Sequence, residues 1–146
     1  MSERQAVPSR ADYAHFCDIQ TRWHDNDVYQ HVNNVIYYSF FDTAVNEHLI
    51  SSGVLDIAKS QAIGLVIETQ CQYFSSVSFP DKVSVGLKVV HLGNSSVRYE
   101  TALFRNDEKN AAALGRFVHV YVDRQTNRPV PIPKPVREVL QSICAN

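Results

Sequence analysis

A cluster of chemically capable side chains lies between residues 24 and 34, directly before the most aromatic part of the chain. The cluster holds two aspartates, two histidines and three asparagines. A carboxylate such as that of Asp27 can act as a general base on water, or as a nucleophile on an activated acyl group. Chemistry of this kind also needs a second group, one that stabilises the negative charge that develops on the carbonyl oxygen. The elements that would position both groups therefore have to be identified.

A helix is predicted to begin immediately after the cluster, with Asn33 or Asn34 as its N-cap. The first N–H groups of a helix have no intrahelical partner, and the helix dipole adds partial positive charge at the same place. Together they can stabilise a carbonyl oxygen that is becoming an oxyanion. Asp27 lies just ahead of this predicted terminus, and a carboxylate facing unpaired N–H groups is the arrangement that acyl transfer needs.

Other interpretations of the cluster are open at this point. The aspartates could serve only as helix caps, and His31 could be a packed, hydrogen-bonded histidine. The sequence "DNDV" is similar to the loop of aspartyl-phosphate phosphatases, but that loop follows a buried apolar strand and here "RWH" precedes it. Histidine and carboxylate also bind metals, yet the spacing matches no defined metal pattern, so we expect no metal. The residues that such a metal site would use are His24, Asp25, Asp27 and His31.

Hydrophobic spacing predicts one long helix over residues 35–50, which "SSG" ends at Gly53. Its apolar stripe is wide, so the helix should be wrapped by other structure rather than lie on the surface. The positions that recur at helical spacing are Tyr37, Phe40, Phe41, Ala44, Val45 and His48 or Leu49.

Alternation of apolar and polar residues predicts strands on both sides of this helix. One strand precedes it at residues 15–23, and four follow at 63–74, 82–90, 96–104 and 116–123. The loops at 92–96 and 105–110 are typical of hairpins, so the sheet should be antiparallel. We expect an α+β fold, in which a curled sheet of about five strands packs around one long central helix. Residues 1–146 should form a single domain with a loose tail at 1–12 and a short C-terminal helix.

Composition narrows the function classes. The chain has 146 residues and a formal net charge of −1, which does not favour binding to nucleic acid or to an anionic membrane. No apolar run has the length of a membrane span, and the first ten residues lack the apolar core of a signal peptide. A cytoplasmic location is therefore expected. In that compartment the three cysteines, Cys17, Cys71 and Cys144, should be free thiols.

The segment "DNDVYQHVNNVIYYSFFDTA" resembles the pattern D-x-D-x-x-G-H-V-N-N-x-x-Y-x-x-x-F of hotdog-fold acyl-CoA thioesterases, in the 4-hydroxybenzoyl-CoA thioesterase-like branch. The likeness continues through "VIETQCQYFSSVSFPDKVSVGLKVVHLGNSSVRYETALF" and into "GRFVHVYVDRQTNRPVPIP". It thus covers nearly the whole chain, from about Phe16 to the C-terminal helix. The order and spacing of the motifs are more specific than any one of them.

The resemblance implies a central helix held in a curved antiparallel sheet, as the periodicity predicts independently. It also implies a homodimer or homotetramer with active sites at the subunit interface. The second aspartate of the pattern, Asp27, would be the catalytic carboxylate. Backbone N–H groups near Asn33, Asn34 and Val35 would polarise the thioester carbonyl, while the side chains of His31 and Asn33 would line or brace the site.

The chain departs from the family pattern at one position. The family usually has glycine before "HVNN", and this chain has Gln30. If the glycine adopts positive φ in relatives, Gln30 must bear strain or shift the loop. Asp25, the first aspartate of the pattern, is expected to order the loop.

The expected function is hydrolysis of an acyl-CoA to a free acid and CoA, with no metal and no bound cofactor, because CoA is part of the substrate. Two alternatives keep the same pocket. One is a thioesterase that acts on an acyl-carrier protein, and the other is a non-catalytic acyl-CoA binder or oligomeric scaffold. The phosphates of CoA should meet basic side chains, for which the candidates are Arg98, Arg116 and Arg128.

Overall fold

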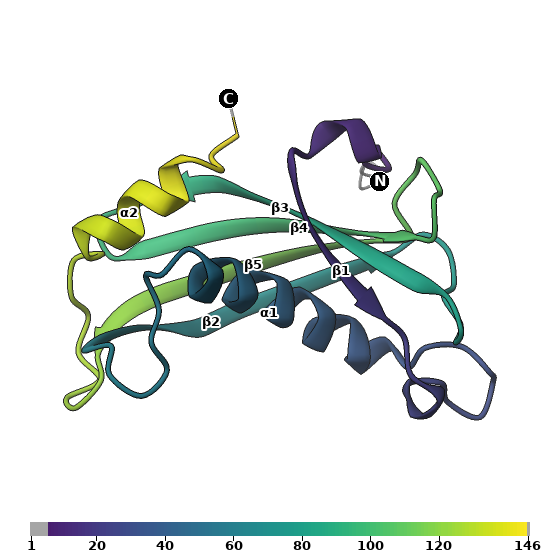
Figure 1. Cartoon of the computed structure of the whole chain (residues 1–146), viewed down its shortest axis with the longest axis horizontal. Helices are drawn as coiled ribbons and strands as arrows, with labels where there is room; N and C mark the ends of the chain where they lie inside the picture. Colours follow the sequence, from purple (N-terminus) through teal and green to yellow (C-terminus); the bar gives the residue numbers. More distant parts are fainter. Residues whose placement is uncertain (1–5, 146) are drawn as a thin grey trace, which may run out of the picture.

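The computed structural model describes residues 6–145. A five-stranded antiparallel sheet with strand order β1-β3-β4-β5-β2 curls around one long helix (Figure 1). The strands are β1 (His15–Gln20), β2 (Ala62–Tyr73), β3 (Lys82–Leu92), β4 (Ser96–Arg105) and β5 (Ala113–Asp123). The predicted α+β fold, with one domain and one central helix, is confirmed.

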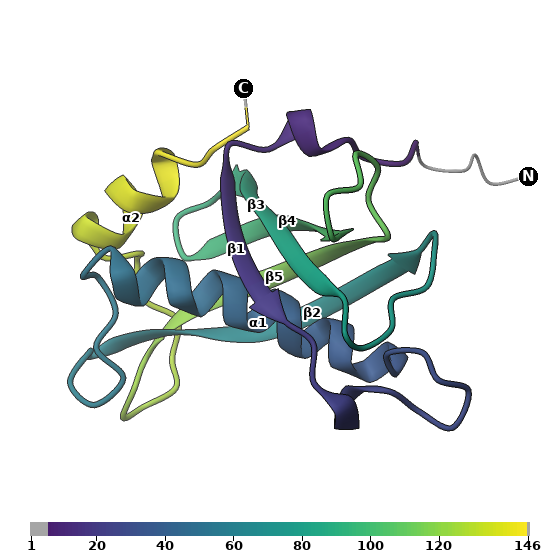
Figure 2. The same ribbon diagram turned by 45° about the vertical axis from the view of Figure 1, so that its right-hand side comes forward.

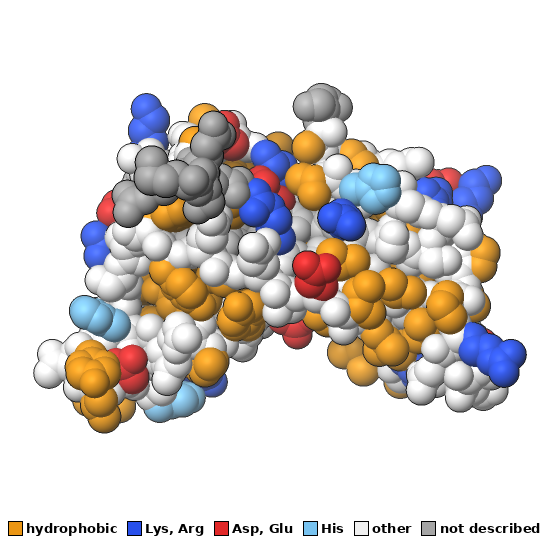
Figure 3. Space-filling model, turned by 180° about the vertical axis from the view of Figure 1, so that it is seen from behind, with side chains coloured by type: hydrophobic (Ala, Val, Ile, Leu, Met, Phe, Trp, Pro, Cys, Tyr) orange, Lys and Arg blue, Asp and Glu red, His pale blue; other side chains and the backbone are white. Residues whose placement is uncertain are grey.

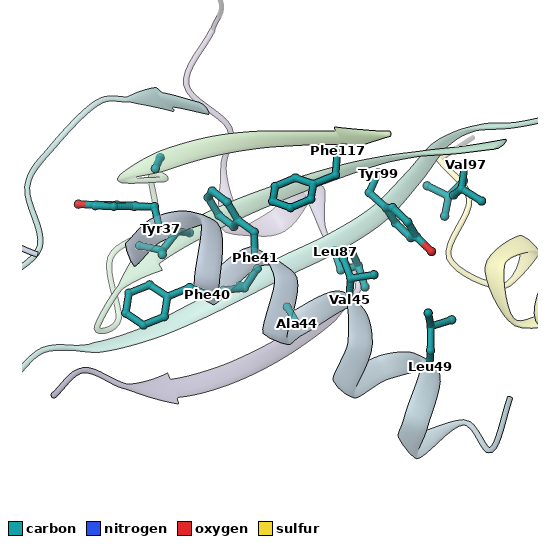
Figure 4. Close-up of a cluster of buried hydrophobic side chains, with 14 of the residues drawn as sticks. Tyr37, Phe40, Phe41, Ala44, Val45, Leu49, Leu87, Val97, Tyr99 and Phe117 are labelled. Atoms are coloured by element: carbon teal, nitrogen blue, oxygen red, sulfur yellow. The ribbon is translucent and has the colours of Figure 1, made fainter. Parts of the chain in front are cut away.

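The central helix α1 (Asn34–Ser51) runs along the concave side of the sheet, as the two ribbon views show together (Figures 1 and 2). Its buried face meets inward-facing residues of the strands (Figure 4). Phe41 is fully buried, and its ring lies edge-on to Phe117, with centroids 6.0 Å apart. A Cβ on Gly115 would come within 2.6 Å of the Phe41 ring, so glycine leaves the space that this ring occupies.

Strand alternation positions this core as predicted. Phe117, His119 and Tyr121 of β5 are buried on the side that faces α1. A shorter helix, α2 (Lys134–Gln141), follows the Pro-rich stretch and packs on β3 through Val136 and Leu140.

The first strand begins at His15 as predicted, but its end and the tail before it differ from expectation. β1 ends at Gln20 rather than at residue 23, because Trp23–Asp25 form a 3-10 turn in which the Asp25 carboxylate accepts from the Arg22 N–H. Of the expected loose tail, residues 1–5 lie outside the described residues. Residues 8–12 are held in place: Arg10–Asp12 form a 3-10 turn, and the Ala111 N–H donates to the Pro8 carbonyl.

No helix within the described residues combines the length and the apolar character that crossing a bilayer requires.

Candidate active site

Asp25 organises the loop that carries the polar cluster. Its carboxylate is completely buried and accepts hydrogen bonds from the Arg22 backbone N–H at 2.7 Å and from the Arg22 guanidinium at 3.0 Å. The Asp25 carbonyl accepts from the Asn33 N–H at 2.9 Å. Because these bonds join both ends of the loop, Asp25 orders it, as expected from the sequence.

The loop between β2 and β3 supports the cluster from the other side. The Phe79 N–H donates to the Asn26 side-chain oxygen at 3.0 Å, and the Ser78 hydroxyl donates to the Gln30 carbonyl at 2.8 Å. The Val32 N–H donates to the Val77 carbonyl at 2.7 Å. Residues about fifty positions apart in sequence thus fix the course of the loop before α1 begins.

Asp27 lies in an open surface cavity of about 810 Å³. One carboxylate oxygen accepts from the Tyr29 N–H at 2.8 Å, and the Asp27 N–H donates to the His31 carbonyl at 2.8 Å. The second carboxylate oxygen accepts no hydrogen bond from the described residues, which leaves it able to accept a proton from water. The cavity is lined by Trp23, His24, Asn26, Asp27, Tyr29, Gln30, His31, Ser78 and Phe79.

The start of α1 leaves one backbone donor free. Asn33 is the N-cap, as predicted, and its side-chain oxygen accepts from the Val35 N–H at 3.1 Å. The Asn33 N–H is bound to Asp25, and the Ile36 N–H donates to the Asn33 carbonyl. The Asn34 N–H has no acceptor among the described residues. Of the three N–H groups named from the sequence, Asn34 is therefore the one available to an incoming carbonyl oxygen.

Tyr73, at the end of β2, anchors the start of this helix. Its hydroxyl donates to the Asn34 carbonyl at 2.9 Å, and its ring lies edge-on to Tyr37, with centroids 5.0 Å apart. Partial burial raises the pKa of the Tyr73 hydroxyl, with the neighbouring Cys71 adding to the shift, so the hydroxyl keeps its proton as a donor at neutral pH. The first turn of α1 is thereby tied to the edge strand β2.

The structure separates the candidate site residues into two groups. Asp27 and His31 line the same cavity, whereas Asn33, Asn34 and Val35 form the adjoining helix start and do not line it. The His31 side chain is exposed.

The three candidate arginines lie away from this cavity. Arg116 approaches Glu100 at 4.0 Å, on the strand face opposite to Phe117 and α1. Arg98 is exposed on β4, and Arg128 lies in the turn after β5. None of the three lines the cavity that holds Asp27.

The residues of the alternative metal site do not converge. The Asp25 carboxylate faces Arg22, while that of Asp27 turns toward the Tyr29 N–H. Among residues 6–145, no group of three or more His, Cys, Asp or Glu side chains is arranged to hold a metal ion.

Gln30 has φ of 65°, in the left-handed region that favours glycine. The departure from the family pattern is therefore accommodated by strain at Gln30 and not by a shift to ordinary backbone angles. A left-handed conformation costs a residue with a Cβ about 1–2 kcal/mol.

We expect Gln30→Gly to raise the free energy of unfolding, by about 0.5–1 kcal/mol after the greater chain entropy of glycine is deducted. Urea denaturation of the two proteins measures the difference. The same substitution at Gln61, an exposed residue outside the positive-φ set, provides the control. A lower stability for Gln30→Gly would show that the strain is offset by contacts of the glutamine side chain.

Sequence patterns did not identify several residues that build the cavity. Trp23 and Phe79 pack edge-on, with ring centroids 6.0 Å apart, although they are far apart in sequence. Ser78 and Phe79 belong to a loop that carries no motif of its own. Only the fold shows that this loop lies against residues 26–32.

Comparison with known proteins identifies the family of the chain. Residues 21–140 match the family model described as the thioesterase-like superfamily. The PA5185 protein of Pseudomonas aeruginosa PAO1 is 53% identical, with a TM-score of 0.94 over 97% of this chain and 99% of that one. A search of curated proteins found no match.

More distant structures share the fold. A thioesterase from Thermus thermophilus, complexed with coenzyme A and Zn, is 26% identical, with a TM-score of 0.75 over 90% of this chain and 95% of that one. The 1,4-dihydroxy-2-naphthoyl-CoA thioesterase Slr0204 from Synechocystis is 14% identical, with a TM-score of 0.80 over 88% of this chain and 96% of that one, a likeness of fold alone. With its central helix, curled antiparallel sheet and match over most of its length, the chain belongs to the thioesterase-like superfamily of hotdog-fold proteins.

Proposed function

We propose that the protein is an acyl-CoA thioesterase that hydrolyses a thioester to a free acid and CoA. The observation that carries the proposal is that one short segment holds both an Asp27 carboxylate oxygen with no hydrogen bond from the described residues and, at the start of the helix that follows, an Asn34 N–H without an acceptor among them. Membership of the thioesterase-like superfamily and the CoA complex of the Thermus relative support the substrate class.

In the proposed reaction the carbonyl oxygen of the thioester accepts a hydrogen bond from the Asn34 N–H. Asp27 then acts in one of two ways: it removes a proton from water that attacks the carbonyl carbon, or it attacks the carbon itself to form an anhydride that water hydrolyses. In both routes the C–S bond breaks, and the CoA thiolate takes up a proton. The partial positive charge of the helix start stabilises the oxyanion. The route needs neither a metal nor a bound cofactor.

A second copy of the chain is proposed to complete the site. β2 is an edge strand of twelve residues, and its outer edge pairs with no strand among the described residues. Leu65, Val66 and Ile67 are unusually exposed for their type, and long apolar edges invite pairing with another chain. Seen from behind, hydrophobic side chains gather toward the lower border, where β2 runs (Figure 3). We propose that two β2 strands pair there in an antiparallel homodimer, which two dimers can extend to a tetramer.

We expect Ile67→Asp to convert the dimer to a monomer, because Ile67 is 63% exposed in one copy and the change would place two like charges near the axis of the pairing. Analytical ultracentrifugation measures the mass. The matched control is Ile57→Asp, which alters an isoleucine that is 71% exposed but lies outside β2. A native protein that is monomeric at micromolar concentration, or a dimer unchanged by Ile67→Asp, would contradict the pairing.

The proposed activity is tested by thiol release from short-, medium-, long-chain and aromatic acyl-CoAs. Turnover of at least one class supports a CoA-dependent thioesterase and identifies its acyl group. Turnover only when the same acyl groups are carried on an acyl-carrier protein would assign the carrier-protein alternative. Tight binding of acyl-CoA without release of thiol would assign the non-catalytic role.

A further inference from the structure

A second cavity, of about 220 Å³, lies between the C-terminal half of α1 and the paired strands β5 and β2. Leu49 of α1, Leu55 of the following loop and Ile63 of β2 supply an apolar wall. His119, Asn46, Tyr121 and Arg124 add polar groups to it, and the Arg124 guanidinium donates to the carbonyls of the loop after α1. A small apolar cavity with few polar groups is typical of a binding site for part of an organic molecule.

His119 is the unusual member of this lining. Its side chain is 3% exposed, and its Nε2 atom has no hydrogen-bond partner among the described residues. Burial lowers the pKa of His119, outweighing the opposite effect of Asp42, so the imidazole is neutral at physiological pH. A neutral imidazole offers one N–H donor and one acceptor nitrogen. The ring nitrogen that lies beside Gly64, another lining residue of the cavity, is Nδ1. A polar atom that lacks a partner in a buried site is costly, and a ligand that supplies the partner would recover that cost.

The residues next to His119 leave space beside its imidazole. Gly64 lies opposite Tyr121, and a Cβ on Gly64 would come within 3.2 Å of His119 Nδ1. Any larger side chain at this position would occupy the space beside the imidazole. Tyr99 packs edge-on against His119, with centroids 5.1 Å apart, and its buried hydroxyl is also unpartnered. The hydroxyl points away from the sheet in Figure 4.

The cavity lies far from the reactive groups of its own copy. Asn46 is twelve residues beyond Asn34, a rise of roughly 18 Å along the helix. In a dimer the cavity lies near a different helix start. Antiparallel pairing of two β2 strands brings the Gly64 end of one strand beside the Tyr73 end of the other. Tyr73 binds the Asn34 carbonyl. In the proposed dimer, the helix start that faces this cavity is therefore that of the second copy.

We propose that this cavity holds the acyl group of a thioester whose carbonyl lies at the α1 start of the second copy, and that this acyl group carries a hydroxyl that pairs with His119. The inference rests on the proposed function and names its substrate class, a hydroxyacyl thioester. The apolar wall takes the carbon chain, and the hydroxyl forms one hydrogen bond with the imidazole, donating to or accepting from the ring nitrogen that faces the cavity. An unsubstituted chain would leave His119 unpartnered and would bind less well.

The test compares butanoyl- to decanoyl-CoA with the same thioesters bearing a terminal hydroxyl. For native protein we expect kcat/KM to favour the hydroxylated member by about tenfold or more at the length that places the hydroxyl at His119. His119→Phe keeps a ring but removes both nitrogens, and it should abolish or reverse the preference. His48→Phe is the matched control, because His48 is also buried with an unpartnered Nε2 but does not line the cavity.

Binding of the free acids separates this inference from the proposed activity, since it requires no turnover. Calorimetry on the full chain should show tighter binding of the hydroxy acid than of the plain acid, even if no thioester is hydrolysed. Gly64→Ala, which narrows the cavity without removing a polar group, should weaken that binding and serves where His119→Phe does not fold. Equal affinities at every length, or a preference that survives both variants, would overturn the inference while leaving the thioesterase proposal intact.

Discussion

Asp27→Asn is expected to lower kcat/KM for thioester hydrolysis by about 10²- to 10⁴-fold, the contribution of a general base. Asparagine has nearly the same shape, and its side-chain oxygen can still accept from the Tyr29 N–H, which Asp27 does at 2.8 Å. The turn should therefore persist, while the amide can neither accept a proton from water nor attack a carbonyl. Thiol release measures the rate, and circular dichroism checks the fold.

The matched control for this variant is Asp56→Asn. Asp56 forms the same kind of turn in another exposed loop, where its carboxylate accepts from the Ala58 N–H at 3.0 Å and the Lys59 N–H at 3.2 Å. Its substitution should leave the rate unchanged. Equal activity in Asp27→Asn and Asp56→Asn would show that Asp27 acts only as a loop and helix cap.

Phe41→Ala is expected to lower the free energy of unfolding by about 3–5 kcal/mol, the usual cost of removing a buried phenylalanine. Phe41 is fully buried, packs edge-on against Phe117 and fills the space above Gly115. No backbone movement closes that space easily, because α1 is held at its start by Tyr73 and along its length by the sheet. Urea denaturation monitored by circular dichroism measures the loss.

Ile50→Ala, on the same helix, is the comparison. Ile50 is 44% exposed near the end of α1, and we expect its substitution to cost no more than about 0.5 kcal/mol. Equal losses of unfolding free energy at the two positions would mean that α1 is not the centre of the core. The Asn34 N–H at its start would then have no fixed position.

Local patterns predicted the fold because each element carries its own signal. Apolar residues recur with helical spacing along α1, and residues alternate along β4 and β5, so the buried faces could be assigned without knowledge of long-range contacts. Asn33 could be predicted as a cap because a side-chain oxygen before a helix has a local role. The signal failed at Trp23, where aromatic character favoured a strand but a 3-10 turn formed.

The site depends on information that no local pattern contains. Residue type alone leaves Asp25 and Asp27 equivalent, and only their contacts separate them: Asp25 is buried against Arg22, while Asp27 lies in the cavity. The availability of the Asn34 N–H follows from hydrogen bonds that occupy its neighbours. The position of Phe79 beside the cluster is a consequence of the tertiary fold.

The most direct test of the account is a single-turnover measurement on the native protein and Asp27→Asn. Each protein, in excess over an acyl-CoA that the native protein hydrolyses, is mixed with that thioester, and bound thioester, free acid and CoA are quantified over time. The account predicts equal amounts of acid and CoA from the native protein, and bound, intact thioester in the variant. Hydrolysis by Asp27→Asn at the native rate would contradict it.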